Sequence, residues 1–241
     1  DAIMVACHCT EATVCRQHIE YSRKRGLLTY GVLMMSHMVS ASELLANATL
    51  MQDYGAQGVL LMDSAGAYMP DDVSVKVGLL SSSLNVDVGF HAHNNLGMAI
   101  ANSIAAARAG AKIIDCTSRG LGAGAGNCQL EVLVAALLKL GYKLDLDLFR
   151  LMDNSEKIIA KIAKKPQEIS SSSLMSGLAG VFSGFAPHVR KAAKTFNVEP
   201  RDIWIELGKR KVVAGQEDII VDVALQLHTK NKKSKMQRYA K

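Results

Sequence analysis

Short apolar segments rich in β-branched residues alternate along this chain with longer segments whose apolar positions have a helical period. This alternation is typical of βαβ units in a parallel sheet. Five such repeats follow one another at nearly equal spacing. The predicted strands are Ala2–Cys7, Thr29–Met35, Gly58–Met62, Asp87–His91 and Lys112–Cys116. The predicted helices after them are Glu11–Arg25, Ser42–Tyr54, Asp71–Ser83, Gly97–Ala109 and Gln129–Leu140.

Residues at the predicted helix ends agree with these boundaries. Ser42 and Asp71 stand where two helices should begin, and such side chains accept hydrogen bonds from the first free amides of a helix. Glycines, which easily adopt the left-handed conformation that ends a helix, stand where four helices should stop: Gly26, Gly55, Gly110 and Gly141.

Recurrence of one unit at one spacing predicts the α/β class and, within it, a (β/α)₈ TIM barrel. A doubly wound sheet is disfavoured, since nothing marks a switch point with a cofactor crevice. Five strands cannot close an eight-stranded barrel, so we expect them to be strands 4–8, with three units upstream. The alternative is that the five units form a smaller open sheet.

After Gly141 the pattern becomes helical throughout. The segment Asp145–Lys164 is amphipathic, Pro166 ends it, and the polar residues Ser170–Ser173 are interpreted as a linker into Leu174–Phe185. Further helices are expected near Pro187–Phe196 and Glu199–Lys209. The predicted domains are therefore five barrel units over 1–144, a helical C-terminal domain over 145–229 and a basic tail over 230–241.

Composition indicates an ordinary globular protein. The chain has 241 residues, of which 49% are hydrophobic and 21% charged. It has no apolar run long enough to cross a membrane and no signal-peptide pattern. Five scattered cysteines indicate reduced thiols and a cytoplasmic location. The net charge of +6 is concentrated in 230–241, which we interpret as a solvated, poorly ordered tail, the alternative being a patch for nucleic acid or a protein partner.

The strongest chemical signal is the pair His91 and His93 at the end of a predicted strand. Alternate residues of a strand point to the same side, so both imidazoles can reach one metal ion. In a barrel, this end of the strands forms the active face. An imidazole pair suits a divalent transition metal, with a carboxylate as third ligand, and Asn94 or Asn95 could orient a ligand. The alternative is that both histidines have only structural hydrogen bonds.

A second candidate cluster follows another strand end, at Asp63-Ser64-Ala65-Gly66. Asp63 offers a carboxylate near the metal, and Ser64 offers a hydroxyl to a substrate carboxylate. The same four residues are also a common turn sequence. His8 and His37 end strands as well and should face the same mouth, in either a structural or a catalytic role.

A third candidate is the glycine-rich segment Arg119–Asn127, after the last predicted strand. Glycines there allow close backbone approach, and free amides at a helix start can bind an anion. We expect this loop to contact a carboxylate or phosphate, or to close the barrel tightly. A dinucleotide fingerprint is disfavoured because no second strand with an acidic residue follows at the required distance.

These motifs together resemble the DRE-TIM metallolyase superfamily, and most closely its 4-hydroxy-2-oxovalerate aldolase family. The resemblance covers the chain from Asp1 to about Leu227. It rests on six segments: His8–Glu11, Leu33–Met38, Asp63–Gly66, His91–Asn94, Gly120–Asn127 and Gly215–Asp222.

The resemblance implies a class II pyruvate aldolase, a lyase that cleaves 4-hydroxy-2-oxo acids to pyruvate and an aldehyde in aromatic hydrocarbon catabolism. It implies that His91 and His93 bind a divalent metal, typically Mn²⁺ but also Co²⁺ or Mg²⁺. Substrate contacts are expected from Ser64 and His91. The Asp that is the third ligand, and the catalytic Arg and His, are expected upstream of this chain.

The same resemblance implies a homo-oligomer that works with an acylating aldehyde dehydrogenase. From composition and charge, neither a membrane nor a nucleic acid is expected as a partner. One departure concerns Leu178 and Phe182, which stand where the family usually has tyrosines. Their missing hydroxyls leave two alternatives: a 2-keto-acid acyltransferase of the same superfamily, and a non-catalytic fragment or subunit. A hydroxymethylglutaryl-CoA lyase is disfavoured, because Ser118-Arg119-Gly120-Leu121 replaces its Gly-Cys-Pro-Tyr segment.

Overall fold

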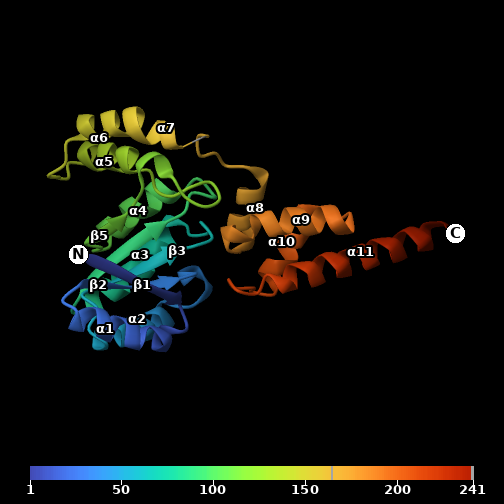
Figure 1. Ribbon diagram of the computed structural model, residues 1–241, viewed down its shortest axis with the longest axis horizontal. Coiled ribbons are helices and arrows are strands. Elements are labelled where there is room, and N and C mark those ends of the chain that lie inside the picture. The colour runs from blue at the N-terminus through green and yellow to red at the C-terminus, as the bar shows by residue number, and fades with distance from the viewer. Residues whose placement is uncertain (164, 240–241) are drawn as a thin grey trace.

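The computed structural model describes residues 1–163 and 165–239. Its centre is one sheet of five parallel strands, in the same order in space as in the sequence (Figure 1). The predicted α/β class with a parallel sheet is thereby confirmed. The strands are β1 (Ala2–His8), β2 (Leu28–Met34), β3 (Gly58–Asp63), β4 (Asp87–Ala92) and β5 (Ile113–Asp115).

A helix follows each strand, and the first four of these helices lead back to the start of the next strand. The helices that follow the strands are α1 (Arg16–Lys24), α2 (Ala41–Asp53), α3 (Pro70–Ser83), α4 (Ala99–Arg108) and α5 (Leu130–Lys139). Sequential strand order with right-handed crossovers places all of these helices on the same face of the sheet. Figure 1 shows α1 and α2 at one end of the sheet and α5 at the other.

The helix ends agree only in part with the sequence prediction. Gly26, Gly55, Gly110 and Gly141 all have positive φ values, between 75° and 106°, as expected. The predicted start of α2 at Ser42 is wrong, because the Ser40 hydroxyl accepts the Glu43 amide and begins the helix. Likewise α3 begins at Pro70 rather than Asp71. The Asp72 carboxylate accepts the Met69 amide there, and proline is well suited to a first helical position.

The core lies between the sheet and its helices, and β3 and β4 are the most deeply buried strands. Phe90, Leu33 and Leu61 are fully inaccessible to solvent. The outer strand β1 differs, since Ile3 and Met4 are 38% and 49% exposed. Among the residues that the structure describes, neither the outer edge of β1 nor that of β5 pairs with another strand.

Two short helices extend the end of the sheet beyond α5. These are α6 (Leu148–Asn154), which packs against α5, and α7 (Ala160–Ile162); the π-helical turn η4 (Ser155–Ile159) joins them. Asp147 caps α6 by accepting the Arg150 amide. The helix expected over Asp145–Lys164 is thus found over 148–162 with a π-helical turn in its middle, and Lys164 lies outside the described residues.

The remaining helices pack around a second hydrophobic cluster of their own. They are α8 (Ser171–Ala179), α9 (Ala186–Phe196), α10 (Pro200–Lys209) and α11 (Asp218–Tyr239), with the 3-10 turn η5 (Ser183–Phe185) after α8. Trp204, Ile203 and Phe185 form the buried centre of this cluster. Figure 1 shows α8 between the sheet and α9–α11.

Two expectations for this region are wrong. The serines over 170–173 are not a linker, because the Ser170 hydroxyl caps α8 by accepting the Ser173 amide. Residues 230–239 are not an irregular tail but continue α11. Lysine and arginine are good helix formers, and positive charge is favourable near a helix C-terminus. Residues 240 and 241 of the predicted tail lie outside the described residues.

No helix among the described residues combines the length and the apolar character needed to cross a membrane.

Candidate metal centre

The two histidines singled out by sequence stand side by side at the carboxyl end of β4. His91 belongs to the strand, and His93 follows it in an isolated bridge to Asn127. Their ring centroids are 5.1 Å apart with an interplanar angle of 87°. Both residues are buried, with exposed fractions of only 7% for His91 and 8% for His93. The alternation of the strand therefore brings both imidazoles to one side, as expected.

Each imidazole is held through its Nδ1 atom. His91 donates from Nδ1 to Asp115 Oδ2 at 2.8 Å, and His93 donates from Nδ1 to the Ser64 carbonyl oxygen at 2.9 Å. Among the described residues, neither Nε2 atom has a hydrogen-bond partner, so both can coordinate a metal ion. Histidine ligands of metals are usually oriented in this way, by a carboxylate or a carbonyl on the other nitrogen.

The electrostatic environment keeps His93 neutral. Burial, and secondarily the nearby His91, lowers the pKa of His93 to about 4, although the hydrogen bond to Ser64 opposes the shift. A neutral imidazole has a free lone pair, so this ring is in the ligating form at neutral pH.

The carboxylate of Asp63 is engaged by the turn that follows β3. Asp63 is completely buried, and its carboxylate accepts the backbone amides of Ala67 and Tyr68 at 2.9 and 3.1 Å. Burial raises the pKa of Asp63 to about 6, although these amide hydrogen bonds lower it. Both oxygens of Asp63 serve the turn after β3, and Asp63 is not grouped with His91 and His93 as a metal ligand among the described residues; a role of this carboxylate near the metal stays a prediction.

Within the described residues, no three His, Cys, Asp or Glu side chains are grouped so that they could hold a metal ion. The site consists of two oriented imidazoles and the carboxylate of Asp115. This carboxylate was missed by the sequence analysis, although it ends the neighbouring strand in register with His91. An acidic residue at a strand end next to a histidine strand was the signal available.

We predict that Asp115→Asn lowers the affinity of the site for a divalent metal by about 10–100-fold, the usual effect of removing an outer-shell partner. The side-chain amide of asparagine cannot favour the His91 tautomer that is protonated on Nδ1 as strongly as the Asp115 carboxylate does. Calorimetric titration with Co²⁺ measures the change. An affinity equal to that of the unmodified chain would show that Asp115 does not support His91.

Ser64 is also completely buried, and its hydroxyl oxygen accepts the Met35 amide at 2.9 Å. Its carbonyl is the group that orients His93. Ser64 thus links the loops after β2 and β3 to the candidate centre. Contact of Ser64 or His91 with a substrate stays a prediction.

His8 and His37 both lie at this end of the sheet. His8 Nδ1 is 2.8 Å from Thr10 Oγ1. His37 donates from Nε2 to the Gly180 carbonyl in the helical region, and its Nδ1 is 4.0 Å from Asp63 Oδ1. Sequence analysis placed His37 at the mouth but gave no sign of the contact with Gly180.

The glycine-rich loop folds on itself. The amides of Gly126 and Asn127 donate to the carbonyls of Ala123 and Gly120, and the Ala125 amide donates to Asn95 Oδ1. A side chain at Gly122 would collide with that of Asn127. Of the two expectations for this loop, the geometry favours tight closure, because these amides are already used within the protein.

The two asparagines after the histidines have different roles. Asn94 Oδ1 accepts the Ala99 amide at the start of α4. Asn95 is completely buried and binds three other segments, none of them through a histidine. The expectation that one of them orients a metal ligand through its side chain has no support in these contacts.

Leu178 and Phe182, the departures from the family pattern, lie on either side of Gly180. Leu178 is 70% exposed on α8, whereas Phe182 packs edge-on against the Phe185 ring at a centroid distance of 5.9 Å. Neither position offers a hydroxyl to the mouth of the sheet.

Comparison with known proteins agrees with the motifs. Residues 7–158 match the HMGL-like family model, and residues 167–229 match the DmpG-like communication domain. The chain is 52% identical to the 4-hydroxy-2-oxovalerate aldolases of Pectobacterium atrosepticum and Bacillus thuringiensis. These matches cover 97% and 93% of this chain but 68% and 66% of those proteins, so the chain spans about two thirds of their length.

Solved structures show the same fold at low identity. The HMG-CoA lyase of Bacillus subtilis superimposes with a TM-score of 0.62 and 21% identity, over 68% of this chain and 64% of that one. The carboxyl transferase domain of Rhizobium etli pyruvate carboxylase superimposes with a TM-score of 0.77 and 16% identity, over 96% of this chain and 42% of that one. The HMGL-like match over more than half of the chain and the 52% identity to these aldolases establish that the chain belongs to the HMGL-like family and, within it, to the 4-hydroxy-2-oxovalerate aldolases, which are lyases.

Proposed function

We propose that this chain carries the histidine half of the active site of a divalent-metal-dependent class II pyruvate aldolase. Its substrates are 4-hydroxy-2-oxo acids of the 4-hydroxy-2-oxovalerate type, and its products are pyruvate and an aldehyde. The observation that carries this proposal is the arrangement of His91 and His93, with both Nδ1 atoms held and both Nε2 atoms free. The 52% identity to 4-hydroxy-2-oxovalerate aldolases supports the choice of reaction.

In this proposal His91 and His93 hold Mn²⁺, or Co²⁺ or Mg²⁺ in its place. A bound divalent ion supplies a Lewis acid that stabilises the negative charge formed on the 2-oxo acid when the carbon–carbon bond breaks. Asp115 fixes the ring of His91, and the Ser64 carbonyl fixes the ring of His93. Burial of both imidazoles limits access of water to the site. The third ligand, and the Arg and His that act on the substrate, are assigned to the part of the relatives' length that this chain does not span.

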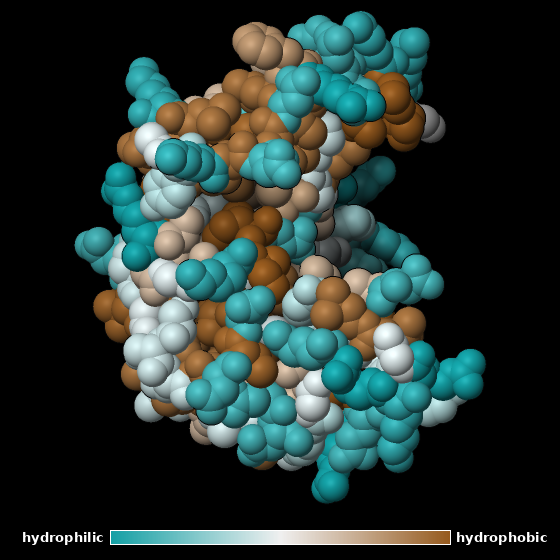
Figure 2. Space-filling model, turned by 90° about the vertical axis from the view of Figure 1, so that its left-hand side faces the viewer, coloured by the Kyte–Doolittle hydropathy of each residue, from teal (hydrophilic) through white to brown (hydrophobic). Residues whose placement is uncertain are grey.

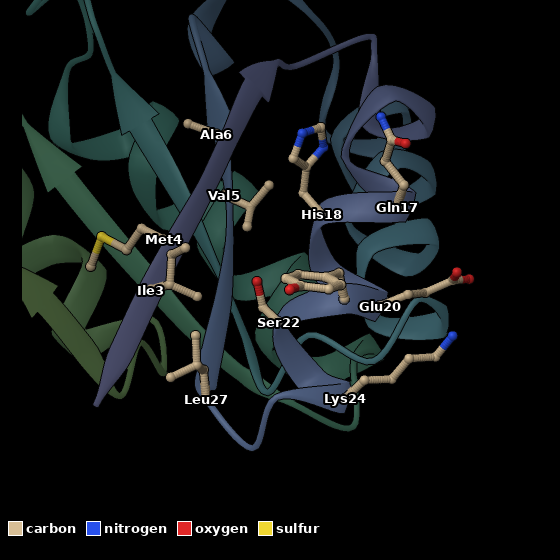
Figure 3. Close-up of a pocket in the computed structure, with 11 residues that line it drawn as sticks. Ile3, Met4, Val5, Ala6, Gln17, His18, Glu20, Ser22, Lys24 and Leu27 are labelled. Carbon is tan, nitrogen blue, oxygen red and sulfur yellow. The ribbon is translucent and has the colours of Figure 1, made fainter.

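We infer that the five strands are strands 4–8 of an eight-stranded barrel. A long unpaired strand edge is a hazard that proteins normally cover, and β1 borders a groove of about 850 Å³ against α1 (Figure 3). The groove has an apolar wall that includes Ile3, Met4 and Leu27. Figure 2 shows apolar surface between the α1–α2 end and the α5–α6 end of the sheet. Further βα units over this apolar surface would cover the outer edges of both β1 and β5.

We propose a division into barrel units over 1–144 and a helical domain that begins at 145 and includes all of α11, and we assign partner binding to the helical domain. The communication-domain match over 167–229 supports this assignment. Exposed apolar side chains on three helices, Leu178, Ile205 and Leu225, support it as well. The partner is an acylating aldehyde dehydrogenase that takes up the aldehyde product, and the aldolase itself is a homo-oligomer.

We further infer that the protein is located in the cytoplasm and takes part in aromatic hydrocarbon catabolism. Cys7, Cys9, Cys15, Cys116 and Cys128 are all free thiols, and four of them are buried. Free thiols are usual in reducing compartments.

A second candidate activity is transfer of an acyl group from acyl-CoA to a 2-keto acid. Leu178 and Phe182 favour this activity, because they lack the hydroxyls that the family tyrosines could use to transfer a proton in the aldol step. Both reactions use the same metal and the same 2-oxo acid end of the substrate, so the metal site does not distinguish them.

The deciding experiment measures pyruvate release from 4-hydroxy-2-oxovalerate with Mn²⁺, using this chain and a version extended by its upstream coding sequence. We expect release by the extended protein and little by this chain, which contributes only two metal ligands. Consumption of acyl-CoA with pyruvate, without aldol cleavage, would favour the acyltransferase. Absence of both activities in a folded, metal-loaded extended protein would leave the non-catalytic reading.

A further inference from the structure

The turn between α8 and η5 lies against the mouth of the sheet, where α8 separates the sheet from α9–α11 (Figure 1). Two polar side chains from the sheet region reach this turn. Asn95 contacts serines on both sides of it, and His37 contacts the carbonyl of Gly180 within it. The metal centre does not use either contact.

Asn95 connects three segments through strong hydrogen bonds. It donates from Nδ2 to the Ala65 carbonyl at 2.7 Å and to Ser183 Oγ at 2.6 Å. Its Oδ1 accepts the amide of Ala125, in the glycine-rich loop, at 2.9 Å. A longer contact of 3.4 Å reaches Ser176 Oγ. One completely buried amide thus holds the loop after β3, the glycine-rich loop and the helical region together.

Three glycines from the same segments leave room for this side chain. An added Cβ at Gly66 or Gly177 would stand 2.9 or 3.1 Å from Asn95 Cβ. An added Cβ at Gly124 would collide with Asn95 Oδ1. Interiors this tightly packed transmit displacement rather than absorbing it. The position of Asn95, two residues after His93, is therefore set jointly by the loops and by the helical region.

His37 makes the second connection. Its Nε2 donates to the Gly180 carbonyl at 3.0 Å, and Gly180 ends α8 in the left-handed conformation, with φ of 64°. Lys76 Nζ donates to the Ser36 carbonyl at 3.1 Å and lies 3.4 Å from that of His37. The backbone that carries His37 is thus anchored to α3.

We propose that Asn95 and His37 form a two-point clasp that couples the helical region to the His91–His93 centre. Asn95 acts as a positioning residue, because it contacts the loops beside His93 and neither imidazole. A ligand that binds to the helical region would then alter the site, and by reciprocity occupation of the site would alter the α8–η5 turn. The metal side of this coupling rests on the proposed function, whereas the coupling between loops and helices does not.

Ser183→Ala tests the clasp with the least disturbance. It removes the acceptor from Asn95 Nδ2 and leaves the contacts with Ala65 and Ala125 in place. Ser172→Ala is the matched control, since Ser172 lies on the neighbouring helix α8 and its buried hydroxyl has no hydrogen-bond partner among the described residues. Amide hydrogen exchange of the whole chain, without metal, is measured for both variants.

We expect Ser183→Ala to speed exchange about tenfold at Ala125, Gly126 and Asn94, the amides that surround the centre, because a buried hydrogen bond is lost. Ser172→Ala should leave these amides unchanged. Faster exchange confined to α8, η5 and α9 would overturn the clasp. Asn95→Ala should speed exchange both in the loops beside the centre and in the α8–η5 turn. His37→Phe should speed exchange in the α8–η5 turn.

A spectroscopic readout separates positioning from general stability. With Co²⁺ bound, the visible absorption of the centre should shift in Ser183→Ala and remain unchanged in Ser172→Ala, at equal thermal midpoints. An unshifted spectrum with Co²⁺ bound would overturn the coupling to the centre. If the unmodified chain and its upstream-extended form bind no Co²⁺, the proposed function fails, and hydrogen exchange still decides the clasp between loops and helices.

Discussion

Replacing both His91 and His93 with alanine is expected to abolish divalent-metal binding by this chain. The two rings are the only imidazoles of the described residues placed together with free Nε2 atoms. Loss of one ring should weaken binding at least about 100-fold, more than the effect of an outer-shell partner. Loss of both should leave no measurable site. Calorimetric titration with Co²⁺ or Mn²⁺ at neutral pH measures the change.

The matched control is His188→Ala, because His188 is an exposed histidine on α9 outside the candidate centre. It corrects for unspecific binding of metal to surface imidazoles. If the double variant retains the metal with the affinity of the control, the metal lies elsewhere and the assignment of His91 and His93 is wrong. The same comparison in the upstream-extended protein should show tighter binding before mutation, since a third ligand is expected there.

The alternation of apolar strands and amphipathic helices predicted the parallel sheet because both patterns are local. Each strand is a short run of mostly apolar residues. Glycines with positive φ, such as Gly55 and Gly110, end the helices between the strands. Backbone conformation at such positions depends on the residue type itself. Sequence order also equals spatial order here, so the first residues after each strand meet at one edge without further assumptions.

What the sequence could not predict depends on contacts between distant segments. Asp63 and Asp115 both end strands, yet of these two only Asp115 accepts a hydrogen bond from one of the paired imidazoles, that of His91. The choice is made by the amides after Asp63, which take up its carboxylate, and by the register that places Asp115 beside His91. Likewise the run of serines before α8 is polar in composition, but one hydroxyl in the right place is enough to begin a helix.

Trp204→Ala removes the largest side chain from the hydrophobic cluster of the helical region. We expect this variant to unfold the helical region without unfolding the sheet. Trp204 is 1% exposed in a cluster distinct from that of the sheet. Its Nε1 has no hydrogen-bond partner within the described part of the chain, so the variant loses packing alone.

A loss of about 3–5 kcal/mol is typical of such a change. Hydrogen exchange should rise across α8–α11 while β3 and β4 stay protected, because the two clusters can open as separate units. The control is Ile205→Ala on the same helix, 41% exposed, which should cost well under 1 kcal/mol. Equal loss of protection in the sheet and the helices would mean that the two clusters form one cooperative unit. The clasp of Asn95 and His37 would then be one part of a continuous core rather than a joint between two parts.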